Sequence, residues 1–112
     1  MRTDGIFAPN ESTASGMLLA LREQGMAGKV KYVGFDANEQ LVDALKQGEI
    51  QGLVVQDPVK MGYLGVMAAV DVLRHRAVEP MIDTGVGLVT TENMDDPAIA
   101  ALIHPPLAEY LK

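Results

Sequence analysis

The stretch VKYVGFDANEQLVDAL, residues 30–45, contains the pattern that decides the fold. Its first part, Val30–Phe35, is an apolar run that predicts a buried strand and stops at a single acidic residue, Asp36. Residues 39–46 then predict a helix, because the apolar residues fall on one side of it: Leu41, Val42 and Leu45. A buried strand followed directly by a helix indicates an α/β fold.

The same strand-then-helix unit recurs on both sides of this stretch. Further strands are expected at residues 5–8, 52–55 and 82–89, and further helices at residues 12–24, from Pro58 to about Arg76, at 98–103 and as a final turn at 107–111. The strands are nearly continuous apolar runs, which is typical of a parallel sheet covered on both faces. The sequence therefore predicts one three-layer α/β domain over residues 1–112, with a mostly parallel sheet flanked by helices.

Composition narrows the class of function. The chain has 112 residues, 48% of them hydrophobic, and a net charge of −6, which fits one globular domain. Its nine Lys and Arg residues are scattered, so nucleic-acid binding is not expected. No apolar run approaches the roughly 18–20 residues that cross a bilayer, and the first residues lack the apolar core of a signal peptide.

Metal and cofactor chemistry are not predicted. The chain contains no Cys, which excludes disulfides and Cys-ligated zinc. The two histidines, His75 and His104, lack the spacing of metal ligands. No nucleophile with a neighbouring base is recognisable, and Gly85-Val86-Gly87 is not a dinucleotide loop because no third glycine and helix follow. An enzyme is therefore not expected.

Polar residues end each of the three leading strands. These residues are Asn10, Asp36 and Gln56, and each lies just before a predicted helix. The carboxyl ends of parallel strands meet at one edge, where open α/β folds bind ligands. Two amides and a carboxylate suit a neutral ligand rich in hydroxyls, because Asp accepts two hydrogen bonds while Asn and Gln both donate and accept.

A purely structural role is the competing interpretation for each of these residues. Asn and Asp before a helix are often N-caps, which contribute about 1 kcal/mol each. Asp57, directly before Pro58, is interpreted in this way. Gln56 is the hardest to explain as structure, because Gln is a poor N-cap.

Four blocks of the sequence resemble the type I periplasmic binding proteins, the ribose-binding-like sugar-binding proteins of ABC transporters. The blocks are FAPNESTASGMLLALREQG, VKYVGFDANEQLVDALKQGEI, IQGLVVQDPVKMGYLGVMAAVDVL and IDTGVGLVTTENMDDP, and they occur in the family's order. The resemblance implies a fragment that corresponds to the C-terminal part of such a protein. It also implies a monosaccharide ligand such as ribose, galactose or xylose, contacts to it from Asn10, Asp36 and Gln56, a transporter permease as partner, and a periplasmic or extracytoplasmic location.

Two other classes share features with this chain. The effector domain of a LacI-type regulator has the same fold, but it would need a DNA-binding headpiece. A phosphoacceptor receiver is of similar size, but it needs an acidic pair after its first strand and a Lys after its last. Here those positions hold Asn10 and, after Val89, Thr90 and Thr91.

The helix that begins at Pro58 predicts self-association. It is apolar on much of its circumference, and such a helix needs burial on more than one side. In the resembling family the chain crosses to a second lobe just after Gln56, and that lobe is absent here. We therefore expect a homodimer in which this helix docks on its neighbour or is exchanged with it. The alternative is a compact monomer in which the helix folds back over its own sheet.

Overall fold

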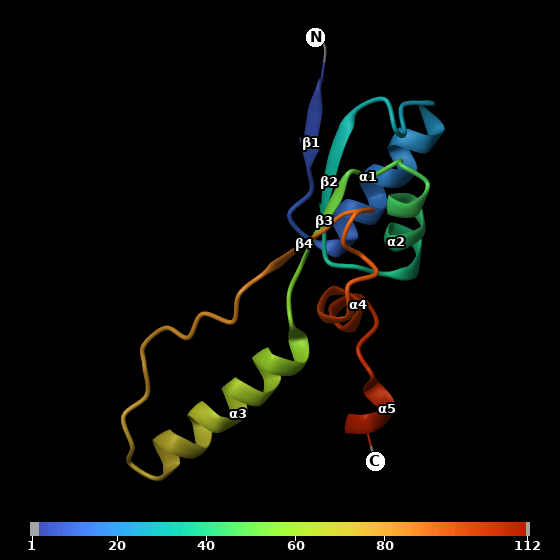
Figure 1. Cartoon of the computed structure of the whole chain (residues 1–112). Helices are drawn as coiled ribbons and strands as arrows, with labels where there is room; N and C mark the ends of the chain where they lie inside the picture. Colours follow the sequence, from blue (N-terminus) through green and yellow to red (C-terminus); the bar gives the residue numbers. More distant parts are fainter. Residues whose placement is uncertain (1–2, 112) are drawn as a thin grey trace.

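The sheet follows the order of the chain. The computed structural model describes residues 3–111, and within them the strands lie in the order β1 (Gly5–Phe7), β2 (Lys31–Phe35), β3 (Gly52–Val55) and β4 (Gly87–Val89) (Figure 1). The pairs β1–β2 and β2–β3 are parallel, and β4 runs antiparallel to β3. This confirms the mostly parallel α/β sheet that the sequence predicts.

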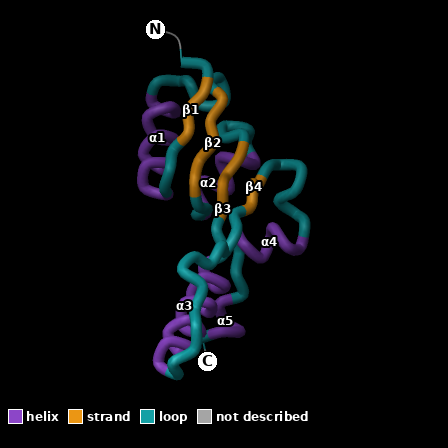
Figure 2. Tube along the Cα trace, turned by 90° about the vertical axis from the view of Figure 1, so that its left-hand side faces the viewer, coloured by secondary structure: helices purple, strands orange, loops and turns teal. Residues whose placement is uncertain are grey.

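Two helices cover one face of the sheet and form the core with it. These helices are α1 (Glu11–Glu23) and α2 (Glu39–Lys46), which begin and end within one residue of the predicted bounds. In Figure 2 both lie behind or beside the strands. The core is formed by alternate strand residues and the apolar sides of the two helices, namely Tyr32, Leu53, Val55, Val89, Ala14, Leu18, Leu41 and Leu45.

A tyrosine and a glycine set the distance between α1 and the sheet. The buried Tyr32 hydroxyl donates a 2.7 Å hydrogen bond to the Ala14 carbonyl, and burial raises the pKa of Tyr32. Two residues further along β2 is Gly34. A Cβ atom at this position would lie 3.0 Å from Leu53 Cδ2 and 3.4 Å from Ala14 Cβ. Glycine at this position therefore lets α1 approach β2 closely.

The second face of the sheet carries no helix within the described residues. Strand register places five apolar side chains there, which we call the open face: Phe7, Val33, Phe35, Val54 and Leu88. Phe7 is 57% exposed and Leu88 is 54% exposed. A parallel sheet is normally covered on both faces, and the sequence pattern predicts such cover. Within residues 3–111 the structure places helices on one face only.

The third long helix, α3 (Pro58–Leu73), projects beyond the end of the sheet (Figure 1). None of its residues is buried. The chain returns through an extended segment to Gly87, which pairs with Val55, so that residues 56–86 leave and rejoin the sheet at adjacent points. We call residues 58–86 the arm. Because of the arm the Cα radius of gyration is 17.2 Å, whereas a compact domain of this length has about 13 Å.

The C-terminal residues form two short helices, α4 (Pro97–Ile103) and α5 (Leu107–Tyr110). Ile103 of α4 enters the core, and Ile99 and Leu102 pack against it. Residues of α4 and of the first turn of α3 line one groove, so the tail lies next to the start of α3. In residues 3–111 no helix combines the length and apolar character that a membrane crossing requires.

Candidate functional site

Asp36 and Gln56 meet at the carboxyl edge of the sheet. Asp36 follows β2 and Gln56 follows β3, and the Gln56 Nε2 group donates a 3.1 Å hydrogen bond to Asp36 Oδ1. Both residues are half-buried. The helices α1, α2 and α3 begin at this same edge, so their N-termini also lie near it. The structure thus brings together two of the three residues that the sequence selects.

The backbone at Asp36 has an uncommon conformation. Its φ is +63°, in the left-handed region, and its N–H donates a 2.7 Å hydrogen bond to the Val54 carbonyl. Residues other than glycine adopt this region at a cost, and Asn and Asp are the most tolerant of them. Such strain often lies at functional positions. Here it turns the chain sharply between β2 and α2, so that the Asp36 side chain lies against Gln56.

This conformation gives a test by substitution. Asp36→Gly is expected to be more stable than Asp36→Ala by about 1 kcal/mol, because alanine must adopt the left-handed region and glycine does so freely. The free energy of unfolding in urea measures the difference. At the exposed position Ala20 in α1 the order reverses, with Ala20→Gly less stable than the parent by about 1 kcal/mol. Equal stability of the two Asp36 variants would contradict the left-handed geometry.

Asn10 acts as a helix cap. Its Oδ1 atom accepts hydrogen bonds from the Thr13 N–H at 2.9 Å, from the Ser12 hydroxyl at 2.9 Å and from the Thr13 hydroxyl at 2.8 Å. The side-chain oxygen is therefore used by α1, and a ligand contact would have to come from the Nδ2 group. Asn10 is not among the residues that line the cavity at Asp36, although its neighbour Glu11 is.

Asp57 has the capping role that the sequence predicts. Its Oδ1 atom accepts a 2.9 Å hydrogen bond from the Lys60 N–H at the start of α3. The Lys60 ammonium group in turn donates a 3.1 Å hydrogen bond to the Thr84 carbonyl. The first turn of α3 is thereby tied to the returning segment of the arm.

A cavity of about 440 Å³ opens beside the Asp36–Gln56 pair. This volume is within the range of small-molecule sites. Its lining combines polar residues, from the strand edge and the first turn of α1, with apolar residues from the loop after β2 and from α3 and α4: Glu11, Asp36, Ala37, Gln56, Pro58, Met61 and Leu102. A lining that combines carboxylate and amide groups with apolar carbons suits a ligand that carries both hydroxyl groups and C–H surface.

Nothing in the sequence marks three of the lining residues, Glu11, Met61 and Leu102, as candidates for a binding site. Glu11 resembles an ordinary first-turn acid, and its Oε1 atom accepts a 3.0 Å hydrogen bond from Asn38 Nδ2. Met61 resembles a core methionine of α3. Leu102 lies in α4, far along the chain, and nothing in its local pattern connects it to Asp36. Only the folded path of the chain brings these residues to the cavity.

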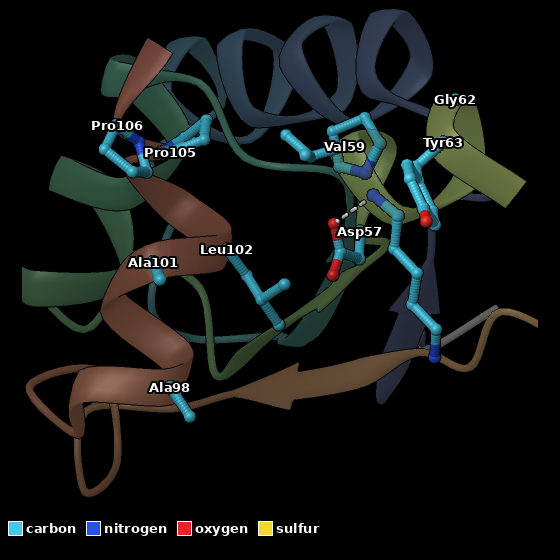
Figure 3. Close-up of a pocket in the computed structure, with 11 residues that line it drawn as sticks. Asp57, Val59, Gly62, Tyr63, Ala98, Ala101, Leu102, Pro105 and Pro106 are labelled. Atoms are coloured by element: carbon cyan, nitrogen blue, oxygen red, sulfur yellow. Dashed lines mark hydrogen bonds between the residues drawn. The ribbon is translucent and has the colours of Figure 1, made fainter. Parts of the chain in front are cut away.

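A larger groove of about 830 Å³ lies between the start of α3 and the tail (Figure 3). Tyr63, Leu102 and Pro106 are among its labelled residues, and its lining is mostly apolar. The dashed line in Figure 3 marks the Asp57–Lys60 capping bond, so the carboxylate there is already engaged. This groove lacks the converging polar groups of the smaller cavity. Among the described residues, no group of three or more His, Asp or Glu side chains is arranged to hold a metal ion.

Comparison with known proteins finds related sequences. A family model described as "Periplasmic binding protein domain" matches residues 2–77. Among curated proteins, the ribose import binding protein RbsB of Haemophilus influenzae is 34% identical over 85 residues, which are 76% of this chain and 28% of that protein. The chain therefore spans less than a third of the length of that relative.

Solved structures of similar shape extend the match to most of the chain. An ABC transporter solute-binding protein from Agrobacterium vitis, solved with bound D-fucose, is 40% identical with a TM-score of 0.83 over 90% of this chain and 35% of its own. A carbohydrate transporter solute-binding protein from Agrobacterium radiobacter, in complex with D-arabinose, is 47% identical with a TM-score of 0.81 over 88% of this chain and 34% of its own.

Proposed function

Because the chain belongs to the family of periplasmic binding protein domains, we propose that it is the sugar-binding C-terminal part of an ABC transporter solute-binding protein. Residues 1–112 then form a single domain that carries part of a binding site. The relatives are named for ribose import or were solved with D-fucose and D-arabinose. A monosaccharide is accordingly the proposed ligand, with ribose, galactose and xylose as the first candidates.

The observation that carries this proposal is the hydrogen-bonded pair Asp36 and Gln56 at the mouth of a cavity of suitable size. The bond between them uses one carboxylate oxygen and one amide N–H. The second carboxylate oxygen of Asp36 then accepts hydrogen bonds from two vicinal hydroxyls of the sugar. The side-chain oxygen of Gln56 accepts a hydrogen bond from a third hydroxyl. Asn10 contributes through its Nδ2 group, since its oxygen caps α1. The roles of these three residues in binding are part of the proposal.

The isolated chain should bind monosaccharides weakly. The cavity leaves one side of a sugar in water, so few hydrogen bonds offset the entropy lost on binding. We expect dissociation constants on the order of millimolar in calorimetry with ribose, galactose and xylose. Amide NMR shifts should move at Asp36 and Gln56, and Asp36→Asn should reduce the shift changes. Asp83→Asn, at an exposed carboxylate outside the cavity, should leave them unchanged.

Two results would count against this account. Sub-micromolar affinity for any of the sugars would mean that the site is complete within this chain. Shift changes confined to residues outside the cavity would remove Asp36 and Gln56 from the site.

The partners and location follow from the same family. We propose that the complete protein delivers its sugar to a transporter permease on the outer side of the cytoplasmic membrane and performs no enzymatic step.

The chain by itself is proposed to pair as a homodimer through the arm, because α3 has no buried residue. Light scattering at low micromolar concentration measures this, and a 12 kDa species would contradict it.

A further inference from the structure

A second carboxylate, that of Glu11, lines the cavity beside the Asp36–Gln56 pair. Glu11 is the first residue of α1 and Asp36 follows β2, so the two carboxylates reach the cavity from different elements. Among the described residues, no Lys, Arg or His side chain belongs to the lining. Both full charges on the wall that this chain contributes are therefore negative.

The Glu11 side chain is held in place by Asn38. The Nδ2 group of Asn38 donates hydrogen bonds to Glu11 Oε1 at 3.0 Å and to Ser15 Oγ at 3.2 Å. The Oδ1 atom of Asn38 accepts a 2.9 Å hydrogen bond from the Leu41 N–H and so caps α2. Asn38 lies two residues after Asp36, so its amide group joins the start of α1 to the loop that carries Asp36. Glu11 is thereby kept at the cavity, although it is exposed to solvent.

The polar atoms that remain for a ligand are mostly hydrogen-bond acceptors. Within the described residues, the side-chain hydrogen bonds of Glu11 and Asp36 involve Oε1 and Oδ1 only. This leaves Glu11 Oε2, Asp36 Oδ2 and the side-chain oxygen of Gln56 as acceptors. Hydroxyl and ammonium groups donate to such atoms, whereas a carboxylate or phosphate group of a ligand has no proton to donate. An anionic ligand would also be repelled by both carboxylates.

Helix N-termini act in the opposite direction, because they attract anions. The helices α1, α2 and α3 begin at this edge, and each N-terminus has the effect of about half a positive charge. Three such ends amount to about 1.5 charges, which is less than the two full charges of Glu11 and Asp36. In addition, Glu39 lies in the first turn of α2 and Asp57 caps α3, so both of these ends are offset by acids of their own. The balance at the cavity is therefore negative.

From these observations we propose that Glu11, held by Asn38, is a specificity-determining residue of the sugar site. It favours amino sugars, which carry an ammonium group, over neutral sugars, and it disfavours sugar acids. This inference rests on the proposed function, because it takes the cavity at Asp36 and Gln56 as the sugar site. Since Glu11 is exposed, water and salt screen its charge, and the expected preference is only a few fold.

NMR titration of the full chain with three related sugars measures this preference: D-galactosamine, D-galactose and D-galacturonate. At about pH 6, where the amine is protonated, galactosamine is expected to bind about fivefold more tightly than galactose, as judged from the amide shifts of Asp36 and Gln56. Galacturonate should bind about fivefold more weakly than galactose. Glu11→Gln should reduce the galactosamine ratio to about twofold, because Asp36 remains. Raising the salt concentration from about 20 to about 300 mM should reduce it likewise in the parent chain.

Glu39→Gln is the matched control. Glu39 is the first residue of α2, as Glu11 is of α1, and it is exposed and outside the cavity. The substitution changes the net charge and a helix N-terminus in the same way, and it should leave both ratios unchanged. Asn38→Ser keeps a residue that can cap α2 but removes the donor to Glu11, so it should lower the galactosamine ratio by about twofold.

Equal affinities for galactosamine and galactose, or the same ratio in Glu11→Gln as in the parent chain, would overturn the role of Glu11 and leave the sugar site in place. An equal loss of the ratio in Glu39→Gln would also overturn it, because the charge of the whole chain would then account for the preference. An unchanged ratio in Asn38→Ser would overturn the positioning by Asn38. If none of the three sugars moved the shifts of Asp36 and Gln56, the proposed function itself would be wrong.

Discussion

Replacing Leu53 with alanine is expected to lower the free energy of unfolding by about 2–5 kcal/mol, as measured by urea denaturation. Leu53 is fully buried in β3, and its Cδ2 atom fills the space that Gly34 leaves beneath α1. Alanine would leave a cavity between β2, β3 and α1 that these elements cannot close without moving. Domains of this size have a total stability of about 5–15 kcal/mol, so this loss is a large fraction of it.

Leu19→Ala is the matched control for this variant. Leu19 lies on α1 and is 49% exposed, outside both the open face and the arm. The same chemical change there should cost less than about 1 kcal/mol, because little area is removed from burial. A similar cost at both positions would contradict the assignment of Leu53 to the core.

Hydrogen exchange in α3 is expected to depend strongly on protein concentration. In a dilute monomer its amides should exchange with protection factors below about 10, because an isolated helix of this length is marginal in water and α3 buries none of its residues. At concentrations where the chain pairs, their protection should rise by about 100-fold or more, since exchange then requires the dimer to open. Mass spectrometry of peptic fragments across residues 58–73 measures this change.

Helix α1 is the internal reference for that measurement. It has similar length but buries Ala14, Leu18 and Leu21 against the sheet. Its amides should show protection that reflects global unfolding and changes little with concentration. If α3 were as protected as α1 at the lowest concentration, the arm would be covered within the monomer, and the proposed homodimer would be wrong.

The sequence best predicts the helices and strands in which the apolar residues of the sequence pattern are also the buried residues of the structure. The bounds of α2 and β3 are those predicted, because the apolar residues of each are also the buried ones. The end of α3 is less well predicted. The helix stops at Leu73, not near Arg76, because His75 adopts a left-handed φ of +55° and the Arg76 side chain pairs with Asp71. No capping residue in the sequence marks that end.

The fourth strand is also shorter than its apolar pattern predicts. An extended segment over residues 82–89 is expected, but only Gly87–Val89 pairs with β3. Gly85 has a φ of +76°, and its N–H donates a 2.8 Å hydrogen bond to Asp83 Oδ1, so a turn interrupts the segment. The antiparallel direction of β4 follows from the return path of the arm.

At the candidate site, the sequence predicts the residues that directly follow strands. It does not predict the lining residues that belong to the helices α3 and α4. Asp36 and Gln56 are predictable because parallel strands end at one edge. For Asn10 the sequence leaves open a cap or a ligand contact, and the structure shows the cap. Met61 and Leu102 reach the cavity through the positions of α3 and α4, which depend on tertiary packing that no local pattern encodes.

The order of the strands has a consequence for how the chain is made. Each of β1, β2 and β3 pairs with its nearest neighbour in sequence, so residues 5–55 close only short loops as they assemble. Synthesis on the ribosome proceeds from the N-terminus, and this segment emerges before residues 58–86 exist. Tyr32 and Leu53 can therefore become buried while the arm is still being translated. The growing chain adds β4 last, as an edge, to a sheet whose three parallel strands are already paired.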